Sequence, residues 1–248
     1  VDFVLNAENP LKQLNEKFDN IERNKPLDIE GWTNSALKGT RAWWGFSFLD
    51  YDAESPNEKV AKVTPYDSKM ESGAGTPVEM ILVTPPLDFK NSATKMFTFK
   101  VRGDYLQDNQ PDLLELCYVD IAEGSLYVQP LAECKMPCTK DESGKWFPYS
   151  IDLTGQQLAD VFFMAFRFTS TRGCDNTATY YIDDVTYGLE TTAIKTVGTT
   201  EKARLTVYNL AGSKVAEKSG SSVADALHGL PRGMYIVKAV SADGVSTS

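Results

Sequence analysis

Nine short runs of aromatic and β-branched residues, separated by segments rich in Gly, Pro, Asn and Asp, constrain the fold of this 248-residue chain more than any other feature. They are RAWWGFSF, KVAKVTPY, VEMILVTPPLDF, KMFTFKVRG, LLELCYVDI, SLYVQPL, WFPYSIDL, VFFMAFRFTST and ATYYIDDVTYG. Such runs are typical of antiparallel strands in a sandwich or barrel. In KMFTFKVRG, Phe97, Phe99 and Val101 occupy alternate positions, which predicts a strand with one buried face. The sequence therefore predicts an all-β fold.

The residues before the first run show a different periodicity. In NPLKQLNEKF, Leu11, Leu14 and Phe18 recur at spacings of three and four residues. This spacing predicts a short helix, because it places apolar side chains on one helical face.

The composition changes after Gly188. Residues 189–202, LETTAIKTVGTTEK, are rich in Thr and contain few large apolar side chains, as expected of a linker. Residues 203–248 follow as two hairpin-like units, with turns at 210–213 and 243–244. We therefore predict a large β-domain over residues 1–188 and a small β-module over residues 203–248.

Charge and hydropathy limit the partners. The net charge is −9 and the Lys and Arg residues are scattered, which argues against nucleic acid as a partner. The longest apolar runs, VFFMAF and MILV, are far shorter than the roughly 18 to 20 residues needed to span a bilayer, which argues against membrane insertion. The chain begins at Val1 without a methionine, so we expect that a leader has been removed or omitted, which is compatible with export.

Cysteine and histidine are sparse. Cys117, Cys134, Cys138 and Cys174 permit three disulfide connectivities in an oxidising compartment, and the sequence leaves all three open. The only histidine is His228, so Cys134 and Cys138 have no second close pair with which to bind zinc. A lone histidine in the C-terminal module also argues against a Ser-His-Asp or Cys-His relay.

The C-terminal module carries a recognisable motif pair. VYNLAGSKV, followed by LHGLPRGMYIVKA, is similar to the C-terminal sorting domain of the Bacteroidetes type IX secretion system. The resemblance covers residues 203–248 and implies a small Ig-like β-sandwich. An Ig-like accessory module without a sorting role is the alternative.

The larger domain resembles a second family. LNEKFDN, IEGWTNSALKGTRAWWG, VEMILVTPPLDF and ATYYIDDVTYG occur in the order typical of the cleaved-adhesin or choice-of-anchor-J group of Bacteroidetes surface proteins. The resemblance spans roughly residues 13–188. It implies a jelly-roll β-sandwich on a secreted or cell-surface protein, binding glycan or protein, with structural calcium.

Two adjacent tryptophans define a candidate contact surface. Because neighbouring strand residues point to opposite faces, Trp43 and Trp44 cannot both enter the core. The outward indole, beside Arg41, would form an apolar platform for a sugar ring or a partner side chain. We predict ligand binding by Trp43, Trp44 and Arg41, and the sequence leaves open which indole is exposed.

The last strand of the large domain contains a candidate metal site. Ile182 and Val185 are three residues apart, so a β-bulge at Asp183 and Asp184 is needed to bury both. Two adjacent acids repel each other unless a cation or a hydrogen-bond donor compensates, and the family resemblance implies that Asp19 lies nearby. We predict a calcium site with Asp19, Asp183 or Asp184 and backbone carbonyls. The alternative is a solvated strand end.

These observations favour a non-catalytic secreted or cell-surface protein that binds glycan or protein. One alternative is a jelly-roll glycoside hydrolase with paired carboxylates, for which Glu115 and Asp120 are the candidates. Another is a structural spacer in a surface assembly.

Overall fold

The computed structural model describes residues 5–48, 59–66, 77–108, 112–122, 125–171, 177–189, 203–208, 213–220, 236–240 and 246–247. The chain divides into two compact units, Val1–Leu189 and Glu190–Ser248. The described secondary structure consists of strands and a short 3-10 helix, η2 (Lys140–Glu142), so the predicted all-β fold is confirmed. Each of the nine predicted runs contains a strand. Among the described residues no helix is long and apolar enough to cross a membrane.

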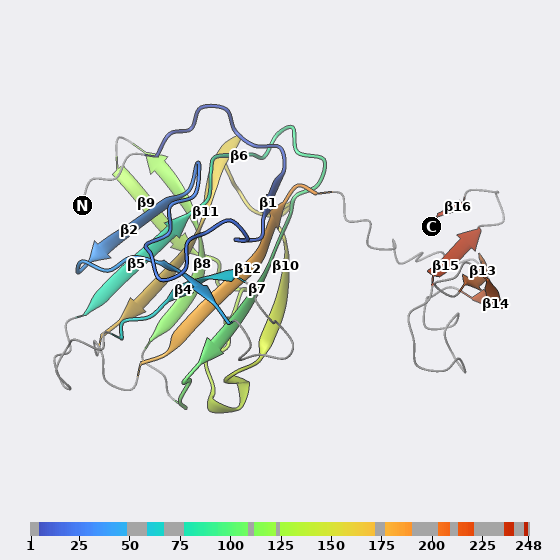
Figure 1. Cartoon of the computed structure of the whole chain (residues 1–248). Helices are drawn as coiled ribbons and strands as arrows, with labels where there is room; N and C mark the ends of the chain where they lie inside the picture. The colour runs from blue at the N-terminus through green and yellow to red at the C-terminus, as the bar shows by residue number, and fades with distance from the viewer. Residues whose placement is uncertain are drawn as a thin grey trace. The chain divides into compact units, whose positions relative to one another are not determined.

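The first unit is a sandwich of two antiparallel sheets (Figure 1). We name one the β12 sheet, in the order β10-β7-β12-β4-β3, with β1 also paired to β12. Its strands are β1 (Leu14–Glu16), β3 (Trp44–Ser47), β4 (Lys59–Val63), β7 (Met96–Asp104), β10 (Trp146–Asp152) and β12 (Thr179–Tyr187).

The second layer is the β11 sheet, in the order β2-β5-β11-β8-β9, with β6 also paired to β11. Its strands are β2 (Thr33–Lys38), β5 (Val78–Val83), β6 (Leu87–Asp88), β8 (Leu113–Ala122), β9 (Ser125–Pro130) and β11 (Val161–Ser170). Strands β1 and β2 lie outside the nine predicted runs, because LNE and TNSALK contain few large apolar residues.

Aromatic side chains from both sheets fill the space between them. Phe97 and Phe99 of β7 meet Phe166 of β11, with ring centroids 6.3 and 5.1 Å apart. All three rings are buried, and burial alternates along the whole of β7, as predicted. Burial of one such ring stabilises the fold by about 1.5–3 kcal/mol relative to leaving it exposed.

The segment predicted to be helical is not a helix. Leu14 begins β1 and pairs with Tyr187 of β12, while Leu11 forms an isolated bridge with Leu87. Phe18 is fully buried with φ of +55°, so the chain turns sharply there. The prediction is wrong because a short isolated helix is marginal, whereas an extended chain pairs with β12 and still buries the same apolar side chains.

Strand β3 lies at the edge of the β12 sheet and is covered by the preceding loop. The amide of Gly45 donates to the Lys25 carbonyl (2.9 Å), and the amide of Asn24 donates to the Gly45 carbonyl (2.8 Å). A Cβ atom at Gly45 would lie 2.2 Å from the Glu22 carbonyl oxygen, so this close approach requires glycine. This pairing satisfies backbone hydrogen-bonding groups of β3 that an uncovered edge strand would leave exposed.

Asn34 links the two sheets beside β3. Its side chain, on β2, accepts a hydrogen bond from the Trp43 amide (2.9 Å) and donates to the Trp43 carbonyl (2.9 Å). It also donates to the Leu27 carbonyl (3.1 Å). These bonds fix the backbone of Trp43 and so the direction in which Trp44 points.

The described strands of the second unit form one sheet, in the order β14-β13-β15-β16. They are β13 (Ala203–Tyr208), β14 (Lys214–Gly220), β15 (Ile236–Val240) and β16 (Ser246–Thr247). The predicted linker, from residue 190 onward, and the turns at 210–212 and 243–244 lie outside the described residues. The Ig-like sandwich stays a prediction.

The described cysteines are free thiols. Burial raises the pKa of Cys117 to about 12 and that of Cys134 to about 11, so both stay protonated at neutral pH. Cys138 is exposed. The three described cysteines form no disulfide, and Cys174 lies outside the described residues.

The two adjacent tryptophans should differ sharply in their effect on stability. Trp43 is fully buried and packs against Phe166, so Trp43→Ala should lower the free energy of unfolding by about 3–5 kcal/mol. Trp44 is 42% exposed, so Trp44→Ala should change it by about 0.5 kcal/mol. Urea unfolding followed by far-ultraviolet circular dichroism measures both, and equal losses would contradict this placement of the indoles.

Candidate functional site

The outer face of the β12 sheet carries a row of aromatic and cationic side chains, one from each of five neighbouring strands. The strand register places Trp44 opposite Lys62, and Lys62 opposite Tyr181. It continues with Tyr181 opposite Arg102, and Arg102 opposite Trp146. Directly opposite residues have Cβ atoms about 4.5–5.5 Å apart, so these side chains form a continuous strip across the sheet.

An aromatic cluster supports this strip. The rings of Phe46, Phe48 and Tyr181 lie within 4.8–5.2 Å of one another, and Phe48 lies 6.0 Å from Trp146. Lys62 Nζ lies 4.7 Å from the centre of the Phe46 ring, and the Arg102 guanidinium lies 4.7 Å from that of Phe48. The cations therefore rest on aromatic faces, which attract positive charge.

Two adjoining hollows open on this face, with volumes of about 630 and 320 Å³. The larger is lined by Phe46, Lys62, Thr64, Tyr66, Tyr105, Gln107, Thr177, Thr179 and Tyr181. The smaller is lined by Asn24, Arg41, Trp44, Gly45, Phe46, Lys62, Thr64 and Tyr66. We name the two together the β12 groove. Their combined size is in the range of sites that hold small ligands.

Three aromatic side chains of the groove are open to solvent. Trp44 is 42% exposed, Tyr66 is 54% exposed and Tyr105 is 70% exposed. Scattered apolar side chains are normal on a surface, whereas a cluster around a hollow is a feature of binding sites. The β12 groove therefore offers ring faces to a ligand.

Hydrogen bonds fix the end of β4 in the groove wall. The hydroxyls of Thr64 and Thr179 lie 3.0 Å apart, and the Tyr66 amide donates to the Thr64 hydroxyl (3.2 Å). The Arg41 guanidinium donates to the carbonyls of Thr64 (3.4 Å) and Pro65. These contacts hold the walls in place before a ligand binds, which lowers the entropic cost of binding.

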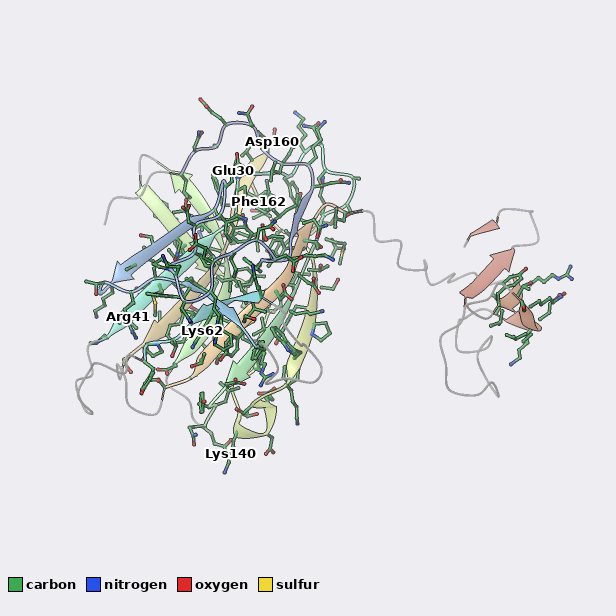
Figure 2. The ribbon with its side chains drawn as sticks, in the orientation of Figure 1. Glu30, Arg41, Lys62, Lys140, Asp160 and Phe162 are labelled. Carbon is green, nitrogen blue, oxygen red and sulfur yellow. The ribbon has the colours of Figure 1, made fainter. Side chains whose placement is uncertain are left out.

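The charge of the groove is opposite to that of the whole protein. Among the described residues that line it, Arg41 and Lys62 are cationic, and none is Asp, Glu, His or Cys. The chain as a whole has a net charge of −9. Figure 2 shows Arg41 and Lys62 in one part of the first unit and Asp160 in another.

Lys62 is the partly buried cation of the groove. Burial lowers the pKa of Lys62, the charge of Asp104 opposes this effect, and the charge of Arg41 adds to it. Asp104 is itself ion-paired with Arg102, with 2.9 Å between Nε and Oδ1. The ammonium group of Lys62 thus stands in a setting that disfavours its charge.

The described lining can bind but lacks the groups of common hydrolytic mechanisms. General acid–base and nucleophilic catalysis use carboxyl, imidazole or thiol groups within reach of the reacting atoms, and the described lining provides none. It provides ring faces, threonine hydroxyls and two cations. Such groups recognise a ligand by stacking and hydrogen bonding.

The predicted ligand-binding residues do not all reach the groove. Trp43 has no exposed surface, and its ring packs edge-on against Phe166 at 6.4 Å. Of the two indoles it is Trp44 that faces outward, and Trp44 and Arg41 both line the smaller hollow. Trp43 supports the site from within the core.

The predicted β-bulge in β12 is present. The pairing of β12 with β7 shifts register between Asp183 and Thr186. Asp184 has φ of +49°, a left-handed conformation that Asp adopts more readily than most residues. Because of the bulge, Ile182 and Val185 are both fully buried.

The predicted calcium ligands differ in burial and in pairing. Asp183 is 2% exposed, whereas Asp19 is exposed in a turn after β1. The Asp184 carboxylate forms an ion pair with Lys100, at 2.5 Å. The described residues contain no group of three or more His, Cys, Asp and Glu side chains able to hold a metal. Lys100 compensates the charge of Asp184, and the calcium site stays a prediction.

The acids considered for glycoside hydrolysis lie elsewhere. Glu115, on β8 of the β11 sheet, accepts two hydrogen bonds from Arg167, at 2.7 and 3.0 Å. Arg167 also lies 3.8 Å from Glu79. The side chain of Asp120 lies outside the described part of the chain. Glu115 therefore belongs to an ion-pair network on the sheet opposite the β12 groove.

Sequence reasoning missed the rest of the groove. Lys62, Tyr66, Tyr105 and Tyr181 come from three separate parts of the chain, and only strand register brings them together. The alternation in KVAKVTPY does place Lys62 and Thr64 on the face opposite Ala61 and Val63, which marks Lys62 as outward-facing. Nothing in the sequence indicates which strands lie beside β4.

Comparisons with known proteins return solved structures alone. No protein-family model matches the chain, and no curated protein matches it. The chain is similar to the K1 cleaved adhesin domain of Lys-gingipain from Porphyromonas gingivalis W83, with a TM-score of 0.43 and 18% identity over 70% of this chain and 96% of that chain. It is also similar to the C-terminal family 22 carbohydrate-binding module of Clostridium thermocellum Xyn10B, with a TM-score of 0.41 and 10% identity over 70% and 92%.

A third similar structure is the β-1,2-glucanase from Parabacteroides distasonis, with a TM-score of 0.40 and 13% identity. That comparison covers 94% of this chain and 38% of the glucanase.

Replacing Lys62 should not destabilise the protein at neutral pH. Because the pKa of Lys62 is lowered on folding, the unfolded state binds more protons between the folded pKa and the ordinary value of 10.5. The stability of the wild type relative to Lys62→Met should therefore rise with pH across that window. We expect the melting temperature of Lys62→Met to equal or exceed that of the wild type at pH 7, and the difference to shrink as the pH rises toward 10.5. A marked fall at pH 7 would contradict this placement of Lys62.

Proposed function

We propose that this protein is a non-catalytic carbohydrate-binding protein, in which the β12 groove receives a glycan. The observation that carries the proposal is Trp44, an exposed indole at the side of a groove whose described lining holds ring faces, hydroxyls and cations but no carboxylate. Function here rests on the site, since a β-sandwich alone fits many functions.

The chemistry of the groove suits a sugar. The apolar face of a pyranose ring packs on an indole, which offers a large, rigid apolar surface. The hydroxyls of the sugar need hydrogen-bond partners when water is displaced, and Thr64 and Gln107 lie in the same groove to supply them. The groove combines both requirements.

Two other functions are less well supported. A glycoside hydrolase needs two carboxyl groups beside one cleft, and Glu115 is engaged by Arg167 on the other sheet. A structural spacer needs no open aromatic groove, so three exposed rings around a hollow argue against it.

Isothermal titration calorimetry with a panel of plant and host polysaccharides tests the proposal. We expect saturable binding to at least one glycan, and a loss of about tenfold or more in affinity for Trp44→Ala, as one stacking contact contributes about 0.5–1.5 kcal/mol beyond its buried area. Tyr127→Ala is the matched control, because Tyr127 is 49% exposed on β9 of the other sheet. This control should bind like the wild type.

The outcomes are distinct. Absence of binding to every glycan in the panel would overturn the carbohydrate function and favour a protein ligand. Equal losses for Trp44→Ala and Tyr127→Ala would place the binding surface outside the β12 groove.

We further propose that calcium stabilises the first unit at the bulge of β12, held by Asp19 and Asp183. The support is the position of the buried Asp183 carboxylate at the bulge, together with the family resemblance that implies Asp19 nearby. A chelator should then lower the melting temperature, calcium should restore it, and Asp183→Asn should remove this dependence. Identical melts with chelator and with calcium would contradict the site.

The finer assignments of fold and location belong to the same proposal. A surface-exposed or secreted binding module is consistent with a jelly-roll first unit of the cleaved-adhesin type and an Ig-like second unit that acts in sorting. The motifs at residues 203–248 support the sorting role. Deletion of residues 190–248 should then retain the protein inside the cells that normally export it.

A further inference from the structure

The ammonium group of Lys62 is placed where an anion can bind to it. Its Nζ lies over the Phe46 ring at 4.7 Å, and within the described part of the chain it forms no ion pair or hydrogen bond with the protein. The other cations of this face are already engaged. Lys100 pairs with Asp184, and Arg102 pairs with Asp104.

Local charge adds to this feature. The protein has 34 acidic and 25 basic residues, yet the described lining of the β12 groove contains Arg41 and Lys62 and no acid. The charge of Asp104 acts on Lys62 from outside this lining, and Asp104 is already paired with Arg102. Both cations line the smaller hollow together with Trp44. A positively charged groove attracts anions, whereas the rest of the surface of this acidic protein repels them.

We propose that the β12 groove is selective for anionic sugars, with the carboxylate or sulfate of a pyranose ring on Lys62 Nζ and the ring itself against Trp44. This inference rests on the proposed carbohydrate-binding function and names the class of glycan. Arg41 supplies a second positive charge to the same hollow.

The spacing of the two residues fits one sugar unit. Trp44 and Lys62 are directly opposite on β3 and β4, so their Cβ atoms lie about 4.5–5.5 Å apart. This is about the width of a pyranose ring, so a single residue of the glycan can stack on the indole and still reach the ammonium group with its acidic substituent. A neutral glycan would gain only the stacking.

The partial burial of Lys62 favours a direct hydrogen bond to an anionic group over a long-range electrostatic attraction. A hydrogen bond between an ammonium group and an anionic oxygen is stronger than one between neutral groups, and more so where water is partly excluded. The lowered pKa of Lys62 agrees with this setting, since an incoming anion would stabilise the charged form. The charge of Lys62 is therefore unfavourable in the ligand-free protein and is stabilised when an anion binds.

Binding of matched ligand pairs to the full chain tests the proposal. Oligosaccharides of polygalacturonate are compared with their fully methyl-esterified forms, and oligosaccharides of κ-carrageenan with their desulfated forms. We expect at least one acidic member to bind about tenfold or more tightly than its neutral partner, the size expected of one charge-assisted hydrogen bond. The pair that shows the difference identifies the carboxylate or the sulfate as the group recognised.

The variants identify the residue responsible. Lys62→Met should abolish the preference for the acidic member, so that the acidic and neutral members bind this variant with equal affinity. Lys90→Met is the control, since Lys90 pairs with Asp160 at 3.6 Å in the part of the unit away from the groove, and it should keep the preference. Lys62→Gln, a polar variant, should behave like Lys62→Met.

The outcomes separate this inference from the function on which it depends. Equal affinity for acidic and neutral members, with loss of both in Trp44→Ala, would overturn the anionic selectivity and leave carbohydrate binding standing. An acidic preference that persists in Lys62→Met would overturn the role of Lys62. Absence of binding to these four ligands and to the wider polysaccharide panel would overturn both.

Discussion

The antiparallel pairing of β12 with β7 and β4 is the constraint on which the site depends. This register places side chains from β3, β4, β12, β7 and β10 in one row, although they come from positions 44 to 181 of the chain. A slip of one residue in any pair would turn its side chains to the other face, because alternate strand residues point in opposite directions. The bulge of β12 lies between Asp183 and Thr186, so residues 179–183 keep a regular register with β7.

The division of labour between Trp43 and Trp44 follows from the same geometry. Trp43 fills the core beside Phe166, and Asn34 fixes its backbone from the opposite sheet. Trp44 then has no alternative to the outer face, where Gly45 lets the covering loop approach β3 closely. A binding surface built on strands held in this way is more precise than one built on loops alone. Trp43 thus contributes mainly to stability, and its neighbour Trp44 contributes mainly to the proposed binding surface.

Much of the fold could be read from the sequence, because aromatic and β-branched runs between turn residues are a direct signal of strands. The alternation around Phe97 and the spacing of Ile182 and Val185 gave the buried face of β7 and the bulge of β12. The helix expected near Leu14 failed, since pairing with β12 outweighs a weak local pattern. Adjacent strand positions implied that one indole faces outward, but its identity depends on the contacts of Asn34. Lys62 could be placed on an outer face, whereas its neighbours depend on non-local pairing that no local pattern encodes.

Whether the β12 groove binds glycan is measured directly by a nuclear magnetic resonance titration of the ¹⁵N-labelled chain with an oligosaccharide of the glycan that binds most tightly in the polysaccharide panel. The account predicts saturable shifts of amides in residues 44–46, 62–66 and 179–181, together with the indole N–H of Trp44, while the amides of β8 and β9 stay unchanged. Shifts that gather on β8 and β9, or no shifts at saturating ligand concentrations, would contradict it.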